Sequence, residues 1–425
     1  MNIVLAIIIL SVIIIIHEFG HFLLAKVNKV CVTEFALGMG PKLLKFKKGE
    51  TEYCLKLLPF GGSCMMLGED EESTNERAFN NKSVWARISI IAAGPIFNFI
   101  LAFVFAIVII AKTGYDPCIV DRVEAPAIEA GLQQGDKIIK INKRKIDLSR
   151  EYAIYQMVYP SDTMEITYIR DGKEYKTTVT PVHIQNEVYQ LGVLVNQNDV
   201  SINSVNEDSA AEKAGIKKGD KLISINGTKL EKVEDISEII NQTKDKAVPI
   251  VVNRNGEELS LTITPKVVKQ DYYEDGITSY GYGVKTTPLE TIKYSFKEVE
   301  YSISTVFDSF LLIFKGQVTT KDVAGPVGIV NLIGDTVEDT KEYGASTVVL
   351  TLLSLATLLS ANLGVMNLLP IPALDGGRLV FLIIEAIRRK PIDREKEGMI
   401  HFIGLMVLMV LMVLILFNDI KNIFT

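Results

Sequence analysis

The chain has 425 residues, which is room for two to four domains, and 48% of them are hydrophobic while 23% are charged. This mixture indicates apolar membrane spans joined to a sizeable soluble part. The formal net charge of −6 argues against nucleic acid as a partner.

The first apolar segment, residues 2–25, carries no charge before the motif His17-Glu18-Phe19-Gly20-His21. As a helix it would rise about 36 Å, enough to cross a bilayer. It lacks a positively charged start and a small-residue cleavage site, so we interpret it as a retained span rather than a signal peptide. His17 and His21 project from one helical face, as two imidazoles must to hold one zinc ion, and Glu18 lies beside them as a candidate base. Three ionisable groups in hydrocarbon argue against a purely structural role.

Three further apolar segments, 88–111, 347–369 and 400–417, have the length of membrane spans. The loops 26–87 and 376–400 hold ten and six Lys or Arg residues, whereas the termini hold almost none. Both loops are therefore expected on the cytoplasmic side, with the termini and the central region outside. The HEFGH motif would then lie toward the cytoplasmic end of its span.

The first loop contains two strand-like runs within residues 50–69, separated by Pro59-Phe60-Gly61-Gly62. This pattern predicts a β-hairpin close to the membrane. The hairpin could serve packing alone, or it could offer an open edge strand to an extended peptide. The four cysteines, which show no CxxC spacing, predict neither a disulfide framework nor a cysteine zinc site; they are Cys31, Cys54, Cys64 and Cys118.

The central region contains an internal repeat. Residues 130–136 (AGLQQGD) return as 214–220 (AGIKKGD), and residues 168–181 return as 252–265, both with an offset of 84 residues. This predicts two copies of one small domain, each with a GD turn, alternating strands, a helix and a β-hairpin. After the repeats in the sequence, apolar residues at helical spacing over 289–314 predict an amphipathic helix at the outer membrane surface, with an ordinary soluble helix as the alternative.

A third zinc ligand is expected after the third apolar segment, because a catalytic zinc site takes three protein ligands and leaves one position open. Pro370 and Pro372 break the helix and force an extended stretch, which is tolerated at membrane depth only where it lines a protein-enclosed cavity. Asp375 follows them on the same expected side as HEFGH. Its alternative role is to cap the next helix, and Glu385 is the nearest rival ligand.

The two remaining histidines are poorly placed for this site. His183 lies between the two repeats, and His401 opens the last apolar segment.

Taken in order, the motifs of this chain resemble the site-2 protease family of intramembrane zinc metalloproteases. The similarity is to the regulator-of-sigma-E-protease-like branch with tandem PDZ domains, and it covers essentially the whole chain. The motifs that carry it are HEFGH (17–21), GMGPKL (38–43), the PFGG hairpin, GPIFNF (94–99), the doubled GD-turn domain, AGPVGI (324–329) and NLLPIPALDGG (367–377).

The resemblance implies a multi-span α-helical membrane protein with four transmembrane helices and two small α+β PDZ-like domains inserted between spans 2 and 3. The expected divisions are spans 1 and 2 with the β-hairpin loop at 1–114, PDZ-like domains at 115–186 and 187–268, a connector with the membrane-surface helix at 269–344, and spans 3 and 4 at 345–425. It also implies Zn²⁺ held by His17, His21 and Asp375, with Glu18 as catalytic base. Substrate would be contacted by Asn367, Pro370 and Pro372.

The function implied is that of a zinc-dependent intramembrane endopeptidase in the bacterial cytoplasmic membrane. Its substrates would be pre-trimmed single-span membrane proteins, such as anti-sigma factors or signal-peptide remnants. The PDZ-like domains would lie on the extracytoplasmic side of the membrane, with peptide carboxyl termini as candidate ligands, and the active site near the cytoplasmic side. The alternative is a catalytically silent PDZ membrane scaffold, which would have no use for Glu18. A metal transporter would need ionisable groups in several spans.

Overall fold

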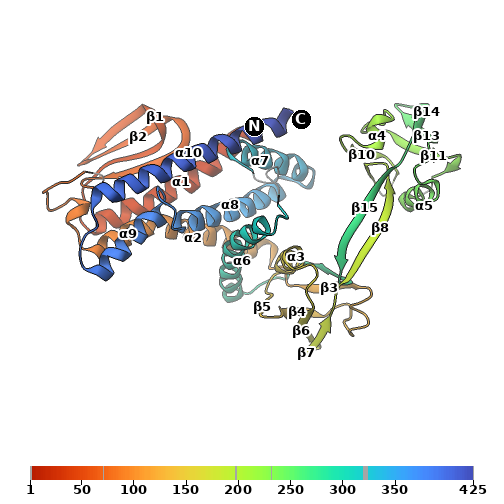
Figure 1. Cartoon of the computed structure of the whole chain (residues 1–425), viewed down its shortest axis with the longest axis horizontal. Coiled ribbons are helices and arrows are strands. Elements are labelled where there is room, and N and C mark those ends of the chain that lie inside the picture. The colour runs from red at the N-terminus through yellow and green to blue at the C-terminus, as the bar shows by residue number, and fades with distance from the viewer. Residues whose placement is uncertain (1, 70, 197–198, 231, 319–323, 425) are drawn as a thin grey trace.

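The computed structural model describes residues 2–69, 71–196, 199–230, 232–318 and 324–424. A bundle of helices forms one part of the molecule, and two smaller parts containing sheets lie to one side of it (Figure 1). In this view both ends of the chain lie at the same end of the bundle (Figure 1).

Among the described residues, four helices contain a segment long and apolar enough to cross a membrane: Val4–Val27, Val84–Thr113, Ala345–Leu368 and Glu395–Asp419. The helices are α1 (Asn2–Val27), α2 (Val84–Thr113), α8 (Ala345–Leu368) and α10 (Arg394–Phe424). Each predicted apolar segment thus forms such a helix, and α2 packs against both α1 and α8. The approach of α1 to α2 requires a glycine, since a Cβ on Gly20 would lie 2.4 Å from the Ala93 carbonyl oxygen.

Further helices belong to this bundle. They are α6 (Pro288–Phe314), α7 (Pro326–Thr340) and α9 (Asp375–Arg388). Asp419 near the end of α10 accepts the N–H groups of Gly325, Val327 and Gly328 at 2.9, 3.1 and 2.9 Å, and so holds the start of α7. This anion at a helix N-terminus gives the AGPVGI motif a structural role.

The helix predicted over 289–314 is α6, and it contacts α2 and α8 as well as α3 (Ser149–Val158) of the first repeat. Among the described residues three ion pairs join the repeat to it: Arg144 with Asp308 at 2.7 Å, Arg150 with Glu298 at 2.6 Å, and Asp147 with Lys297 at 3.0 Å. The helix therefore lies between the bundle and the first repeat.

The first loop forms β1 (Val32–Lys48) and β2 (Thr51–Met66), which pair with each other. The two strand-like runs predicted to pair do not face one another, because a segment of β1 lies between them. Glu34 is opposite both Glu52 and Met65, and Leu37 is opposite both Leu55 and Gly62. The prediction of β structure here is right, but its pairing was wrong, because residues 32–39 also extend and take the central place.

The first repeat is a sheet in the order β16-β3-β4-β6-β7, with β5 on β4 and helix α3 beside it. The second repeat has the sheet β12-β11-β13-β14, the pair β10-β9, and helices α4 and α5. The bounds are β3 Ile119–Val123, β4 Lys137–Ile141, β5 Arg144–Lys145, β6 Met164–Arg170, β7 Lys173–Val179, β9 Val193–Val195, β10 Ile202–Val205, α4 Ala210–Lys213, β11 Lys221–Ile225, β12 Thr228–Lys229, α5 Val233–Thr243, β13 Val248–Arg254, β14 Glu257–Ile263 and β16 Ile277–Tyr280.

Each repeat contains an equivalent ion pair between the aspartate of its GD turn and an arginine 34 residues later. Asp136 binds Arg170 at 2.7 Å and Asp220 binds Arg254 at 2.7 Å. Each aspartate also accepts a main-chain N–H from three residues earlier.

A two-stranded ribbon, β8 (Val182–Gln190) with β15 (Lys266–Glu274), joins the repeats (Figure 1). The chain leaves the first repeat along β8, forms the second repeat, returns along β15 and then adds β16 to the first sheet beside β3. The second repeat is therefore inserted into the first. This corrects the expected connector at 269–344, whose first residues belong to the ribbon and the sheet. The sequence repeat does not reveal this insertion. In the second repeat the edge strand, β9, comes first in the chain, whereas the edge strand of the first repeat, β16, comes after the whole second repeat.

Cys118 lies in the core of the first repeat and is fully buried. Burial raises the pKa of its thiol to about 12, so Cys118 serves as a core side chain. All four cysteines are free thiols.

Candidate active site

His17, His21 and Asp375 converge on one point, although α1 and α9 are far apart in the sequence. The Nε2 atoms of His17 and His21 are 3.2 Å apart. Asp375 Oδ2 lies 3.2 Å from His17 Nε2 and 3.4 Å from His21 Nε2. The three atoms form a nearly equilateral triangle.

This triangle fits a zinc ion. Donors about 2.0–2.1 Å from a tetrahedral zinc ion lie about 3.3–3.4 Å from one another, which matches the spacing of the three atoms. Asp375 Oδ2 is buried and has no hydrogen-bond partner within the described chain. A shared cation would satisfy an oxygen and two nitrogens that cannot all pair with one another.

The outer ring nitrogens of both histidines are held by α2. His21 Nδ1 lies 2.9 Å from the Ile90 carbonyl oxygen, which can only accept, so His21 Nδ1 carries the proton and leaves Nε2 free. His17 Nδ1 lies 3.2 Å from the Asn98 side-chain amide, whose oxygen is buried without a partner. The two amide atoms are interchangeable in assignment, and with its oxygen toward His17 the amide would accept the Nδ1 proton in the same way.

Two glycines make room for this arrangement. A Cβ on Gly94 would lie 2.2 Å from His21 Nε2, and a Cβ on Gly62 would lie 2.6 Å from Glu18 Cγ. Larger residues at either position would displace the imidazoles or the carboxylate.

A polar cavity of about 310 Å³ opens over the triangle. Its lining includes all three residues of the triangle, Glu18, and Gly62, Cys64 and Met66 from the end of β2. The remaining lining residues are Glu69, Ile91, Ala373, Leu374 and Arg378. Glu18 thus reaches the same space as the triangle without belonging to it.

Asn367, Pro370 and Pro372, the three residues predicted to contact substrate, are not among those that line this cavity. Asn367 is half-buried in the last turn of α8. The prolines lie in the segment between α8 and α9, where Pro372 packs on α10 at Gly404. The sequence predicted that these residues contact substrate, and the structure places them outside the lining of this cavity.

The segment that carries Asp375 is braced by the last helix. His401 Nδ1 accepts the Ala373 N–H at 2.9 Å. Asp375 is the first residue of α9, and no side chain caps that helix, so its alternative role as a cap is not seen. His401, which the sequence placed poorly for a zinc ligand, instead supports the segment that carries Asp375.

Glu385, the rival ligand, points elsewhere. It forms an ion pair with Arg87 on α2. Both line a second polar cavity of about 450 Å³, and the neighbouring ion pair of Arg378 with Glu69 lines both cavities. Glu385 therefore belongs to the wall of the adjoining cavity.

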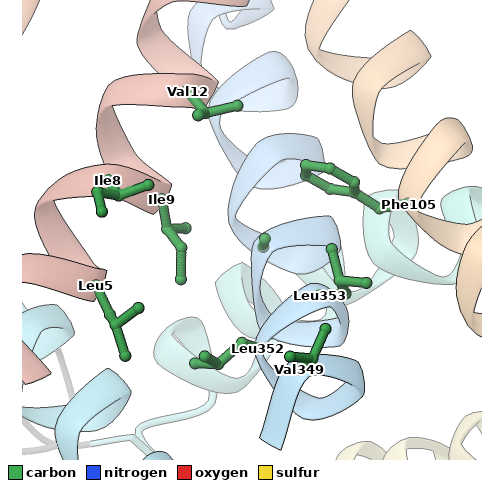
Figure 2. Close-up of a pocket in the computed structure, with 9 residues that line it drawn as sticks. Leu5, Ile8, Ile9, Val12, Phe105, Val349, Leu352 and Leu353 are labelled. Carbon is green, nitrogen blue, oxygen red and sulfur yellow. The ribbon is translucent and has the colours of Figure 1, made fainter. Parts of the chain in front are cut away.

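A third cavity of about 270 Å³ is lined only by apolar side chains of α1, α2 and α8 (Figure 2). Leu5, Ile8, Ile9 and Val12 on the first half of α1 face Phe105 and the side chains of α8 across it. Its lining residues carry no side chain that could act as a catalyst, and such an apolar lining favours contact with hydrocarbon groups over water.

Sequence reasoning missed Ile90, Gly94 and Asn98 as parts of the site, along with Gly62. The signal for three of them was present as the GPIFNF and PFGG motifs. The carbonyl of Ile90 has no signal in the sequence, because any residue could supply it.

Comparison with known proteins identifies the family to which the chain belongs. Residues 5–411 match the model of peptidase family M50. The chain is similar to zinc metalloprotease RasP of Geobacillus kaustophilus, with 31% identity covering 100% of this chain and 98% of that protein. It is also similar to regulator of sigma-W protease RasP of Bacillus subtilis, with 32% identity covering 98% of each.

Proposed function

The chain belongs to peptidase family M50, the site-2 protease family, and is an intramembrane zinc metalloprotease, and from this premise we propose that His17, His21 and Asp375 hold the zinc while Glu18 is the catalytic base. The single observation that carries the assignment is the triangle of two imidazole nitrogens and one carboxylate oxygen with sides of 3.2, 3.2 and 3.4 Å.

Zinc held at the triangle would supply a Lewis acid that polarises the scissile carbonyl. Glu18, in the same cavity, takes a proton from the attacking water and returns it to the leaving amine. Gly62 packs against the Glu18 side chain and limits where its carboxylate can move. Ile90 and Asn98 fix the two imidazoles, so the ligands need not reorganise during the reaction.

A transmembrane helix hides its carbonyls in i→i−4 hydrogen bonds, so cleavage requires a locally extended substrate. Residues 62–66 of β2 lie along the cavity and are paired on one side with residues 32–37. Within the described chain no strand pairs with their other edge. An extended substrate segment could add to this edge, which would bring its carbonyls over the triangle.

We further propose that the substrates are transmembrane segments of pre-trimmed single-span proteins, of the anti-sigma-factor or signal-peptide-remnant type. Support comes from the apolar spans that surround the site and from the B. subtilis relative, which is named a regulator of sigma-W protease. The loop charges favour an active site near the cytoplasmic side of a bacterial membrane, with both repeats on the outer side.

A catalytically silent scaffold is not favoured. Glu18 stands in the cavity over an intact ligand triangle, and a scaffold has no use for that carboxylate. Cleavage by the purified enzyme, its loss with a chelator and its return with zinc decide between the two functions. A metal-free enzyme that still cleaves would overturn the proposal.

The repeats, as PDZ-like domains, would control which substrates enter and would bind peptide carboxyl termini. Gln190 and Lys266 face each other across the ribbon, so residues 191–265 can be replaced by a two-residue Asn-Gly turn. The shortened enzyme should cleave trimmed substrate as before and accept bulky untrimmed substrate. Continued rejection of the untrimmed substrate by the folded, zinc-loaded variant would rule out gating by the second repeat.

A further inference from the structure

The two repeats build the same slot between an edge strand and a helix. In the first, β16 pairs with β3 and α3 lies opposite; in the second, β9 pairs with β10, and α5 corresponds to α3. The same hydrogen bond closes each pair: Glu124 N–H donates to Gly276 O at 2.8 Å, and Asn206 N–H donates to Gly192 O at 2.9 Å. Gly276 and Gly192, with φ of 74° and 77°, are therefore equivalent positions.

The residue after each glycine presents its N–H to the slot. Ile277 is opposite Val123, and Val193 is opposite Val205. Because hydrogen-bonded and non-hydrogen-bonded pairs alternate along an antiparallel ladder, the N–H groups of Ile277 and Val193 point away from the partner strand.

In the first repeat this N–H is taken by Asp275. Asp275 Oδ1 accepts the Ile277 N–H at 2.9 Å, while Oδ2 accepts the Tyr152 hydroxyl at 2.6 Å and the Gln156 amide at 2.8 Å. Asp275 is only 6% exposed. Burial and the neighbouring Asp275 raise the pKa of Tyr152 well above its usual range, so the phenol remains a donor. A carboxylate thus sits in the slot, bound from the strand and from the helix.

The second repeat has apolar residues at the same three places. Leu191 precedes Gly192 as Asp275 precedes Gly276. Ile236 and Ile240 stand 84 residues after Tyr152 and Gln156. All three apolar side chains are buried in one core cluster, and Leu191 has no acceptor to offer the Val193 N–H.

Peptides bind such modules by adding a strand to an exposed sheet edge, with the terminal carboxylate captured by main-chain N–H groups. We propose that Asp275 is an internal substitute for a peptide carboxyl terminus. It fills the carboxylate position of the first repeat, so that only the second repeat is open to a peptide with a free carboxyl end. The apolar floor of Leu191, Ile236 and Ile240 selects an apolar last residue. This rests on the proposed function, in which the repeats bind carboxyl termini.

The test uses the full-length chain in detergent, with Glu18→Gln to prevent cleavage of the probe. The probe is a fluorescein-labelled octapeptide ending in Ala-Val with a free carboxylate, and its control is the same peptide with an amidated end. Fluorescence anisotropy gives the affinity and calorimetry gives the number of sites. We expect one site, and at least tenfold weaker binding of the amidated peptide.

Two reciprocal variants locate the site. Leu191→Asp with Ile236→Tyr and Ile240→Gln copies the first slot into the second and should abolish binding. Asp275→Leu with Tyr152→Ile and Gln156→Ile copies the second slot into the first and should raise the number of sites from one to two. Tyr152→Phe, which removes one hydrogen bond from Asp275, is a milder variant should the triple variant not fold; it should permit weak binding at the first repeat. Asp208→Asn, which removes an exposed negative charge and tolerates the left-handed backbone of that residue (φ 52°), is the control and should change nothing.

Two sites in the parent chain, or crosslinking of the peptide to β16 with Asp275 intact, would overturn the proposal. So would a folded Asp275 variant that gains no site while the second repeat still binds. A parent chain without any site, combined with a site gained by the Asp275 variant, would support the role of Asp275 and refute peptide capture by the second repeat. Proteolysis of membrane substrate is measured separately, so these outcomes do not depend on it.

Discussion

Two groups of three ligand-type side chains occur within the part of the chain that the structure describes, and only one of them suits a metal ion. His17, His21 and Asp375 form the first; Glu34, Glu52 and Cys54 in the β1–β2 sheet form the second. In the second group Glu34 binds Lys42 at 2.6 Å and Lys56 at 2.7 Å. Two ammonium groups therefore already neutralise the carboxylates.

The first group shows no such compensation, since the ion-pair partners of Asp375 are the two imidazoles. The comparison teaches that proximity of ligand atoms is not enough to indicate a metal site. The two groups differ in whether neighbouring cationic side chains neutralise the carboxylate: lysines do so for Glu34, and no ammonium or guanidinium group is paired with Asp375 among the described residues. A buried carboxylate with no ammonium or guanidinium partner calls for a cation, and a paired one does not.

The sharpest way to break this comparison is to remove Asp375. Asp375→Ala should weaken zinc affinity by orders of magnitude and eliminate proteolysis, because two imidazoles alone leave the ion without its anionic ligand. Zinc content of the purified, detergent-solubilised variant measures this. Glu385→Ala, whose carboxylate pairs with Arg87, is the matched control and should keep its zinc. Full zinc in the first variant with loss in the second would move the ligand to Glu385.

A second test separates binding from chemistry. Glu18→Gln should retain zinc and lower the cleavage rate by about 10²–10⁴-fold, because proton transfer is lost while the triangle is intact. Single-turnover cleavage together with metal analysis checks it. A variant that lost its metal would make Glu18 a ligand rather than a base.

A smaller effect on zinc affinity is expected from Asn98, which contacts the ligand His17 rather than the metal. Asn98→Ala removes the amide beside His17 and should weaken zinc binding about 10–100-fold, as measured by competition with a chelator. Ser360→Ala removes the hydrogen bond that Ser360 donates to the Asn98 carbonyl oxygen at 2.8 Å, but it leaves the amide in place. It serves as the control, and equal weakening in both variants would show that helix packing, not the amide, is responsible.

The smallest effect on zinc is expected from the second group. Burial alone would raise the pKa of Glu34, but the hydrogen bonds from Lys42 and Lys56 outweigh it and lower that pKa below its usual value. A lowered pKa in the folded state means that the ion pairs stabilise the sheet at neutral pH and that this stabilisation is lost as the pH falls through the lowered pKa. Glu34→Gln should therefore lower the melting temperature at pH 7, with a smaller difference in acid, and leave the zinc content unchanged. Zinc loss in this variant would erase the distinction between the two groups.

Much of this site could be predicted because its proposed catalytic and zinc-binding residues lie in short sequence motifs. The i, i+4 spacing of His17 and His21 fixes their common face, and the proline break before Asp375 brings a carboxylate to the same depth. The four apolar helices follow from length and composition alone. These signals are local, and local geometry is what a sequence pattern specifies well.

The rest depended on contacts between distant segments. The carbonyl of Ile90 could come from any residue type. The pairing of residues 32–39 between two arms of β2 depends on competition among strands that look alike. The place of β16 depends on a partner strand that precedes a whole inserted repeat. None of these has a periodicity to reveal it.

That insertion sets the order in which the outer part of the protein can fold. The strand beside β3 ends at Tyr280, so the first sheet cannot close until every residue of the second repeat has been made. The second repeat, contiguous in the chain, can fold while its host is still open. Closing the host then requires β3 and β16 to meet across the whole intervening stretch, a contact of high sequence separation that is slow to form in a flexible chain. The ribbon reduces that cost, because once the second repeat has brought Gln190 and Lys266 together, zipping β8 along β15 delivers β16 to its place.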